Sequence, residues 1–279
     1  MELPEPAVVA AQDLLRGCSL PAGESRALLC HVLGIPRERL IAHPETAVGA
    51  AHRRRFEHAA AQRLRGMPLA YLVGAQEFYG HRIAVSPAVL VPRPDTELLV
   101  DAALRILAGR PGASVLELGT GSGCIAIALS LARPDALVVA TDRSWDALQV
   151  ARENRLQLGA RVHLVAADWY EPLAGTYDLI VSNPPYIAAN DAHLPALSFE
   201  PRAALTDGGD GLGALRRIVA GSPARLAPHG HLLVEHGYDQ GAAVRALFRQ
   251  SGFWDVQTLH DLAGRDRACL GVLRGAEAA

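Results

Sequence analysis

The stretch with the clearest capacity for chemistry is Asn183-Pro184-Pro185-Tyr186, which follows the apolar run YDLIV (177–181). The run reads as a buried β-strand. Proline donates no backbone hydrogen bond and holds φ near about −65°, so the strand must end before the two prolines. An asparagine amide, a rigid peptide carbonyl and an aromatic ring are therefore presented together where a strand leaves its sheet. The alternative is an ordinary Asn-Pro turn with a surface tyrosine.

These groups suit the gripping of a planar nitrogen, in an amide or an exocyclic amine. The Asn183 side-chain oxygen can accept one hydrogen of such an NH₂ group, and the Pro184 carbonyl can accept the other. The Tyr186 ring can pack on the flat group and exclude water. A delocalised nitrogen is a weak nucleophile and no strong base is at hand, so the site would act by orientation. We predict Asn183, Pro184 and Tyr186 as catalytic, and Asn183, Pro184, Pro185 and Tyr186 as substrate-binding.

A second constellation, LELGTGSGC (116–124), predicts a nucleoside site. Its three glycines let the backbone turn tightly and approach a ligand closely. The next strand, LVVATD, ends in Asp142, whose carboxylate suits the two hydroxyls of a ribose. A glycine-rich loop alone can be only a tight turn, but strand, loop, helix and acid in this order favour nucleoside binding. The predicted cofactor contacts are Glu117, Gly119, Thr120, Gly121, Ser122, Gly123, Asp142, Asp168, Trp169 and Asn183.

The spacing of the glycines narrows the choice of ligand. They run G-x-G-x-G and not G-x-G-x-x-G, Glu117 precedes them, and the chain has no lysine to hold a phosphate. These features suit a cationic ligand without phosphate. S-adenosylmethionine has that character, with S-adenosylhomocysteine as its product, and no metal is expected. Asp168 and Trp169 end the third strand, where they could meet the adenine as acceptor and apolar wall; core packing is the alternative for Trp169.

The elements that must position these residues alternate between strand and helix patterns from Arg93 onward. This alternation predicts an α/β fold with a parallel sheet covered on both faces. The predicted strands are 114–118, 137–142, 162–166, 178–183, 231–235, 255–260 and 268–273. The predicted helices are 123–131, 145–158, 212–227 and 240–251. No helical pattern separates the last two strands, so we expect the final strand to be antiparallel and at the sheet edge.

The rest of the chain divides into two parts by its patterns. Residues 1–74 show apolar residues at helical spacing, broken into four or five short helices. Residues 75–92 mix aromatic and β-branched residues around Gly80 and predict a β-hairpin linker. Residues 93–279 then form the catalytic domain.

The composition excludes several classes of protein. A formal net charge of −2 over 279 residues argues against charge-driven binding of nucleic acid, so no direct nucleic-acid contact is expected. All 27 basic residues are arginine, which excludes lysine bases and phosphate-binding P-loops. The start lacks the basic region of a signal peptide and no apolar run has the length of a membrane span. Four scattered cysteines indicate a reducing cytoplasm, and we expect a cytoplasmic monomer without a membrane partner.

Several motifs together resemble one known family. They are PLAYLVGAQEFYG (68–80), VPRPDTELLV (91–100), ELGTGSGCIAIAL (117–129), NPPYI (183–187), EPRAALTDGGDGL (200–212) and DLAGRDR (261–267). Their order resembles the bacterial N5-glutamine methyltransferases that modify class-1 peptide chain release factors, the HemK family. The resemblance implies a Rossmann-like class I methyltransferase with a seven-stranded sheet and an N-terminal helical domain that recognises the substrate. It also implies methyl transfer from S-adenosylmethionine to N5 of the glutamine in the release factor's Gly-Gly-Gln motif, which supports translation termination.

Two other functions stay open at this point. NPPY is shared with adenine-N6 nucleic-acid methyltransferases, which are the alternative among enzymes. A scaffold that binds S-adenosylmethionine without turnover is the alternative outside them.

Three further segments stand out in the sequence. The first two have two interpretations each, and the third has one. In VPRPDTE (91–97), the prolines set up a helix capped by Asp95 or Thr96, or the segment lines the mouth of the active site. HRRRF (52–56) is a solvated helix face or a contact with an acidic surface of the protein substrate. GGDGLG (208–213) predicts a loop that opens a helix and closes over the substrate pocket.

Overall fold

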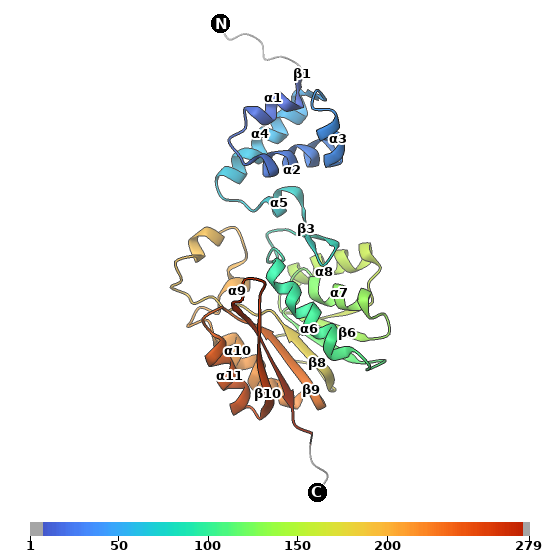
Figure 1. Ribbon diagram of the computed structural model, residues 1–279, viewed down its shortest axis with the longest axis vertical. Coiled ribbons are helices and arrows are strands. Elements are labelled where there is room, and N and C mark those ends of the chain that lie inside the picture. Colours follow the sequence, from blue (N-terminus) through green and yellow to red (C-terminus); the bar gives the residue numbers. More distant parts are fainter. Residues whose placement is uncertain (1–7, 276–279) are drawn as a thin grey trace. The chain divides into compact units, whose positions relative to one another are not determined.

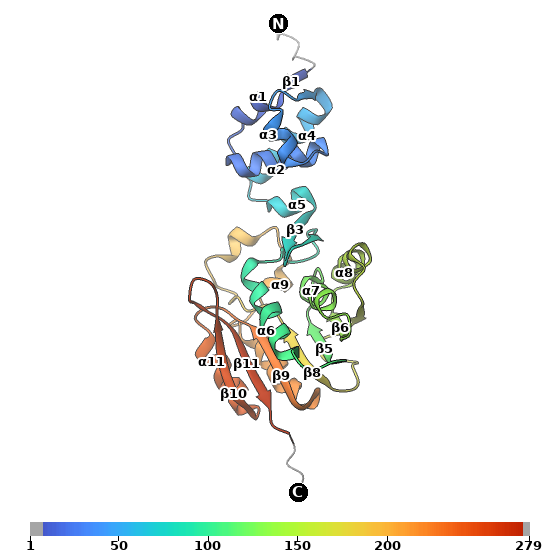
Figure 2. The same cartoon turned by 45° about the vertical axis from the view of Figure 1, so that its right-hand side comes forward.

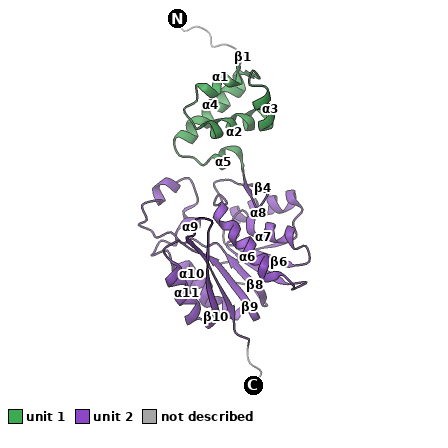
Figure 3. Ribbon diagram, in the orientation of Figure 1, with its two compact units in different colours: residues 1–75 green, residues 76–279 purple. Residues whose placement is uncertain are grey.

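The computed structural model describes residues 8–275, and its contacts divide the chain into two compact units, residues 1–75 and 76–279 (Figure 3). No helix among residues 8–275 is both long and apolar enough to cross a membrane. The two units are described in turn below, the first briefly, because the residues with predicted chemistry lie in the second.

The first unit is built from short helices, as its apolar spacing predicts. They are α1 (Ala11–Arg16), α2 (Ala22–Leu33), α3 (Arg37–Ala42), α4 (Ala50–Leu64) and α5 (Leu69–Val73). Their core includes Leu28, Leu29 and Phe56, and the Arg63 guanidinium of α4 donates to both carboxylate oxygens of Glu24 on α2, at 2.7 and 3.1 Å. An antiparallel pair, β1 (Val8–Ala10) with β2 (Ala47–Gly49), was not predicted, because three residues are too few to show a strand period.

A hairpin, β3 (Ala75–Phe78) with β4 (His81–Ala84), precedes the large sheet. Its two-residue turn has φ of 50° at Tyr79 and 75° at Gly80. Positive φ at both central residues matches the twist of paired strands, which explains the glycine at position 80. The Tyr79 backbone N–H and hydroxyl donate to Glu97 and Asp101, both at 2.8 Å, and so fasten the hairpin to the following helix.

The second unit contains a seven-stranded sheet in the order β10-β11-β9-β8-β5-β6-β7 (Figures 1 and 2). Its strands are β5 (Ser114–Leu118), β6 (Leu137–Asp142), β7 (Val162–Ala166), β8 (Tyr177–Ser182), β9 (Leu226–Glu235), β10 (Phe253–His260) and β11 (Asp266–Leu273). Strands β5 to β9 pair in parallel, and only β11 runs against its neighbours. The predicted parallel α/β sheet is confirmed.

Helices cover both faces of this sheet. On one face α6 (Glu97–Leu107), α7 (Cys124–Ala132) and α8 (Trp145–Leu158) pack side by side; on the other lie α10 (Gly213–Gly221) and α11 (Gly241–Gln250) (Figure 2). The core under α10 and α11 takes alternate residues of the strands, such as Leu116 and Leu118 of β5. Short turns complete the unit: η1 (Pro94–Thr96), η2 (Leu194–Leu197), α9 (Arg202–Leu205) and η3 (Ser222–Ala224).

The last two strands differ from the sequence prediction. They form the expected antiparallel hairpin, but β11 lies between β9 and β10, so β10 is at the edge. Burial explains the order: Ala268 and Cys269 of β11 are fully buried, whereas β10 carries exposed polar side chains such as Asp255 and Gln257. A strand hydrogen-bonded on both sides takes the apolar sequence, and the polar one tolerates the open edge.

Several element boundaries also differ from the predicted ones, most of them by one or two residues. The helix predicted for 212–227 ends at Gly221, and β9 begins at Leu226, five residues before the predicted start. The segment APHGH contains proline and glycine, which mask the strand period. Strand β8 ends at Ser182, so Asn183 lies just outside the sheet.

Asn154 of α8 joins the hairpin to the cofactor loop. Its side chain accepts from the Ala84 N–H at 2.7 Å and donates to the carbonyls of Ala84 and Ser122, both at 2.9 Å.

We expect Asn154→Leu to lower the free energy of unfolding by about 3 kcal/mol, because buried backbone groups lose their partners. Gln157→Leu, on the exposed side of the same helix, is the control and should change it by less than about 0.5 kcal/mol in urea titrations. Equal losses would contradict this role.

Candidate active site

The glycine loop follows β5 and leads into α7. All three glycines have positive φ, 71° at Gly119, 55° at Gly121 and 83° at Gly123. A Cβ on Gly123 would lie 3.1 Å from Ile127 Cδ1 and 3.2 Å from Ala151 Cβ, so this position also needs the absence of a side chain. The loop is therefore a tight turn of fixed conformation at the carboxyl end of β5.

Glu117 holds this loop from beneath. Its side chain is 1 % exposed, and its Oε2 accepts from the Thr120 hydroxyl at 2.6 Å and from the Ala126 N–H at 3.0 Å. Burial raises the pKa of Glu117 to about 8, against the opposite effect of these two hydrogen bonds. The carboxyl group therefore fixes the loop and also contributes to the wall of the neighbouring cavity.

Asp142 stands at the end of β6, beside the loop. Its Oδ2 accepts from the Gly121 N–H and its Oδ1 from the Ser144 N–H, both at 2.9 Å. A carboxylate has about four acceptor sites, so two stay available for a ligand's hydroxyls. The backbone thus orients this carboxylate and leaves it able to accept from a ribose.

Asp168 and Trp169 follow β7. Asp168 pairs with Arg217 of α10 at 2.8 Å. Trp169 has a φ of 58°, which a bulky residue rarely adopts, and its ring Cζ3 lies 3.6 Å from where a Cβ on Gly119 would stand. Its ring also packs against the core beneath α10 and α11. Trp169 therefore both packs in the core and walls the cavity.

A cavity of about 470 Å³ opens at the carboxyl ends of these strands. All the predicted cofactor contacts except Gly123 line it, together with Pro185. Gly123 contributes the close packing of loop and helix described above. The segments before α6 and after α9 complete the wall, including Pro92, Arg93 and Thr206.

A second, smaller cavity of about 80 Å³ adjoins the first. It is lined by Pro184 and Tyr186, with apolar side chains such as Ile187 and Leu197. Asn183 lines both cavities. The predicted clamp is therefore divided: Pro185 faces the larger cavity, Pro184 and Tyr186 the smaller one, and Asn183 stands between them.

The side chains of the clamp have defined partners. The Asn183 Nδ2 donates to Thr96 Oγ1 at 3.1 Å, and its Oδ1 has no hydrogen-bond partner in the described part of the chain. The Tyr186 hydroxyl donates to Glu235 Oε1 at 3.0 Å, and burial raises the pKa of Tyr186, so the phenol stays neutral. Neither residue is placed to act as a strong base.

The turn before α6 gives a different answer from the predicted cap. Neither Asp95 nor Thr96 caps the helix with its side chain, so that interpretation is wrong. Asp95 instead forms an ion pair with Arg267 at 3.3 Å, and the Thr96 hydroxyl oxygen accepts a hydrogen bond from the Asn183 amide nitrogen. The segment lines the mouth of the cavity, which was the alternative interpretation.

Residues that sequence reasoning missed lie in the two flanking motifs. Leu90, Arg93 and Ala204 line both cavities beside Asn183. Arg93 forms an ion pair with the buried Glu200, whose other oxygen accepts from the Val91 N–H at 3.0 Å. Glu200 thus joins VPRPDTELLV to EPRAALTDGGDGL. The two motifs stand out in the sequence, but nothing in either one shows that they pair with each other, because the paired residues are more than a hundred positions apart.

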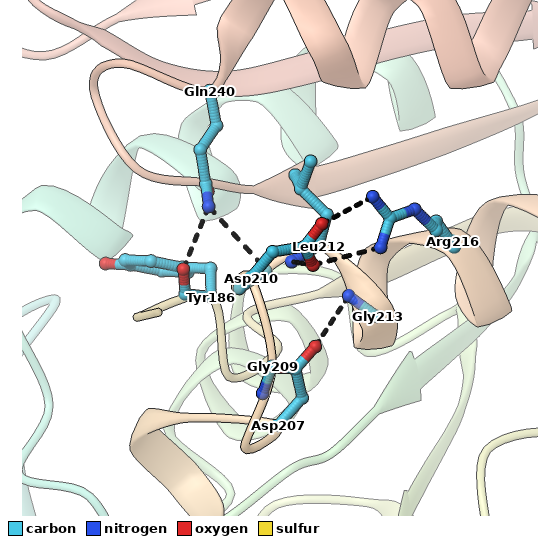
Figure 4. Close-up of polar contacts among 9 residues, drawn as sticks. Tyr186, Asp207, Gly209, Asp210, Leu212, Gly213, Arg216 and Gln240 are labelled. Carbon is cyan, nitrogen blue, oxygen red and sulfur yellow. Dashed lines mark hydrogen bonds and ion pairs between the residues drawn. The ribbon is translucent and has the colours of Figure 1, made fainter. Parts of the chain in front are cut away.

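The 207–213 loop closes against the clamp (Figure 4). The Gln240 amide donates to the carbonyls of Tyr186, at 2.9 Å, and Gly211, at 3.4 Å. The Asp207 carboxylate accepts from the Gly209 and Gly213 N–H groups, at 2.9 and 2.6 Å, and so shapes the loop. As predicted, the loop opens a helix, since α10 begins at Gly213.

No group of three or more histidine, cysteine or acidic side chains within residues 8–275 could hold a metal ion. His236, close in sequence to His229 and His231, is fully buried. Its Nδ1 lies 2.8 Å from the Gly237 carbonyl.

A fold with the glycine loop, Asp142 and the Asn-Pro-Pro-Tyr clamp at one sheet edge defines an α/β methyltransferase. The family described as "Methyltransferase small domain" matches residues 95–211, and "PrmC N-terminal domain" matches residues 7–74. A solved methyltransferase from Pyrococcus furiosus shares the fold, with a TM-score of 0.55 at 18% identity over 77% of this chain and 99% of that one.

The particular family follows from closer relatives. A "Release factor glutamine methyltransferase" of Bordetella pertussis is 54% identical over 94% of this chain and 98% of its own length. One of Burkholderia pseudomallei is 47% identical over 99% of this chain and 100% of its own. This chain belongs to the release factor glutamine methyltransferase family.

The contact between the 207–213 loop and the clamp can be isolated with two matched glycines. Gly208 and Gly211 have φ of 82° and 79°, but only a Cβ on Gly211 would meet a neighbour, the Tyr186 carbonyl oxygen at 2.3 Å. Each alanine should cost about 1–2 kcal/mol through its φ. Gly211→Ala should lower the free energy of unfolding by about 2 kcal/mol more than Gly208→Ala, because the loop must move away. Equal losses in urea titrations would count against close packing here.

The raised pKa of Glu117 predicts a dependence of stability on pH. A carboxyl group with a pKa of about 8 in the folded protein and 4.5 ordinarily favours folding below pH 4.5, and that contribution is lost as the pH rises to about 8. Glutamine has no proton to lose and keeps an acceptor oxygen. The stability of Glu117→Gln relative to the wild type should therefore rise with pH between about 5 and 8, by at most about 1.4 kcal/mol per unit. A constant difference in urea titrations would disprove the raised pKa.

Proposed function

We propose that this protein transfers a methyl group from S-adenosylmethionine to the side-chain amide nitrogen, N5, of a glutamine. The acceptor is the glutamine of the Gly-Gly-Gln motif in class-1 peptide chain release factors. The names of the relatives support this substrate, because each is a release factor glutamine methyltransferase. The observation that carries it is the Asn183 side-chain oxygen, which has no hydrogen-bond partner among residues 8–275 and belongs to a residue that lines both cavities.

The residues of the larger cavity fit the cofactor. Asp142 has acceptor capacity left for the ribose hydroxyls, the glycine loop offers a close backbone approach, and Trp169 supplies an apolar wall. Asp142 puts a carboxylate beside a ligand that carries a positive charge, whereas the raised pKa of Glu117, about 8, keeps that group protonated near neutral pH. When bound, S-adenosylmethionine supplies an electrophilic methyl group on a cationic sulfur.

The smaller cavity suits the glutamine side chain. Its apolar walls can hold the methylene groups of a glutamine, and the Tyr186 ring can pack on the flat amide. The Asn183 Oδ1 and the Pro184 carbonyl then accept the two amide hydrogens. An amide nitrogen fixed in this way presents its face toward the larger cavity, where Asn183 and Pro185 form part of the wall.

Orientation then supplies the catalysis. The amide lone pair is delocalised, and the carboxyl groups of Glu117 and Glu235, beneath the glycine loop and behind Tyr186, are buried and hydrogen-bonded within the protein. A well-placed pair of reactants lowers a barrier by up to about 7–11 kcal/mol. The new nitrogen–carbon bond would form as the methyl–sulfur bond breaks, with S-adenosylhomocysteine as the leaving group. The methylated nitrogen would then be acidic enough to release one proton to water.

The first unit completes the proposal. We propose that residues 1–74 recognise the release factor and that the protein acts as a cytoplasmic monomer without direct contact to nucleic acid. Arg54 and Arg55 of α4 are exposed and are available for contact with an acidic surface of the protein substrate, whereas Arg53 is paired with Glu57 at 3.0 Å.

The test is methylation of a purified class-1 release factor, read by mass spectrometry of its Gly-Gly-Gln peptide. Wild-type protein should add a single methyl group to the glutamine, and Asn183→Ala should lower kcat by about 100-fold or more, because the amide loses its orientation. Asn190→Ala, an exposed asparagine seven residues later, is the matched control and should leave kcat unchanged.

A parallel reaction with adenine-containing DNA distinguishes the enzyme alternative. Transfer of label to DNA and not to the release factor would overturn the proposed substrate. An Asn183→Ala variant as active as the wild type would overturn the proposed clamp.

A further inference from the structure

We infer that Thr96 is a positioning residue, whose hydroxyl oxygen selects the face of the Asn183 amide that meets the reacting group. The inference rests on the proposed function, in which the Asn183 oxygen accepts a hydrogen from the substrate amide. It adds a residue that acts through Asn183 without touching the substrate itself.

The need for such a residue follows from the symmetry of an amide. The oxygen and the NH₂ group of asparagine have almost the same size, so packing alone barely distinguishes one orientation from its reverse. The reversed side chain would point an N–H donor at the substrate's own N–H group. A fixed polar partner must therefore decide the orientation, and for Asn183 that partner is Thr96 Oγ1, 3.1 Å from Nδ2.

A hydroxyl group can donate as well as accept, so its own proton must be engaged elsewhere. Glu235 provides that engagement: it is 1 % exposed, and its Oε1 already accepts from the Tyr186 hydroxyl. Its Oε2 is a buried atom with no hydrogen-bond partner among residues 8–275, and the nearby Thr96 side chain is one of the causes that lower the pKa of Glu235 against the larger effect of burial, which raises it. When Glu235 is ionised its carboxylate only accepts, so the Thr96 proton turns toward Glu235 and a lone pair is left for Asn183.

The position of Thr96 is itself fixed. Its side chain is 2 % exposed, and its backbone N–H donates to the Arg93 carbonyl at 3.1 Å. The preceding residue, Asp95, pairs with Arg267 at 3.3 Å, and Arg267 also pairs with Asp261 at 3.1 Å. The turn that carries Thr96 is therefore tied to β11 and to the loop before it. Asn183, which follows β8, and Glu235, at the end of β9, thus both interact with the side chain of Thr96.

The experiment compares two substitutions of the same residue. Thr96→Val keeps the shape of the side chain and removes the lone pairs, whereas Thr96→Ser keeps the hydroxyl and removes a methyl group. Methylation of the purified release factor by each full-length variant gives kcat and the KM values for the release factor and for S-adenosylmethionine. Thermal unfolding of each variant gives an independent measure of folding.

Thr96→Val should lower kcat by about 10- to 100-fold, because Asn183 then samples the reversed orientation. Its KM for S-adenosylmethionine should stay within about twofold of the wild type, since the loop and Asp142 are untouched. Thr96→Ser should recover most of the lost kcat. If Thr96→Val retains wild-type kcat, or Thr96→Ser is as impaired as Thr96→Val, the inference is wrong. A wild-type protein that methylates no glutamine would instead refute the proposed function.

Discussion

The pairing of β5 with β8 is the constraint on which the site depends. Leu118 stands opposite Ser182 in the parallel register, and the Ser182 hydroxyl donates to the Leu118 carbonyl at 2.7 Å. The residues that follow these two, Gly119 and Asn183, therefore leave the sheet side by side. The glycine loop and the Asn-Pro-Pro-Tyr segment lie next to each other because of this one register. A slip of a single residue would turn each side chain of β8 to the other face.

Buried carboxyl groups then fix what the sheet places. Glu117 sits beneath the glycine loop, Glu200 binds Arg93 and the Val91 N–H, and Glu235 receives the Tyr186 hydroxyl. Each stands behind a segment that lines a cavity and accepts hydrogen bonds from that segment. A buried carboxyl group is costly to desolvate, and the raised pKa values of Glu117 and Glu235 reflect that cost.

The sequence predicted those parts of the fold whose pattern is local. Strands β5, β6 and β7 begin and end where their apolar runs do. The sheet position of β11 was not predictable from its own residues, because it depends on the relative burial of two neighbouring strands. The glycine loop and the clamp were found because each is contiguous. The partners of the clamp were not, since the Asn183 contact with Thr96 spans 87 residues and that of Tyr186 with Glu235 spans 49.

The Gln240 side chain links three separate backbone segments of the site. Its amide nitrogen reaches the carbonyls of Tyr186 and Gly211, and its amide oxygen accepts from the Gly237 N–H at 2.8 Å. Figure 4 shows the two contacts of the amide nitrogen, and with the Gly237 contact one side chain holds three stretches of backbone. If that side chain moved away, all three stretches would lose a hydrogen bond at the same time. They would then open in one concerted motion and not by independent fluctuations of each loop.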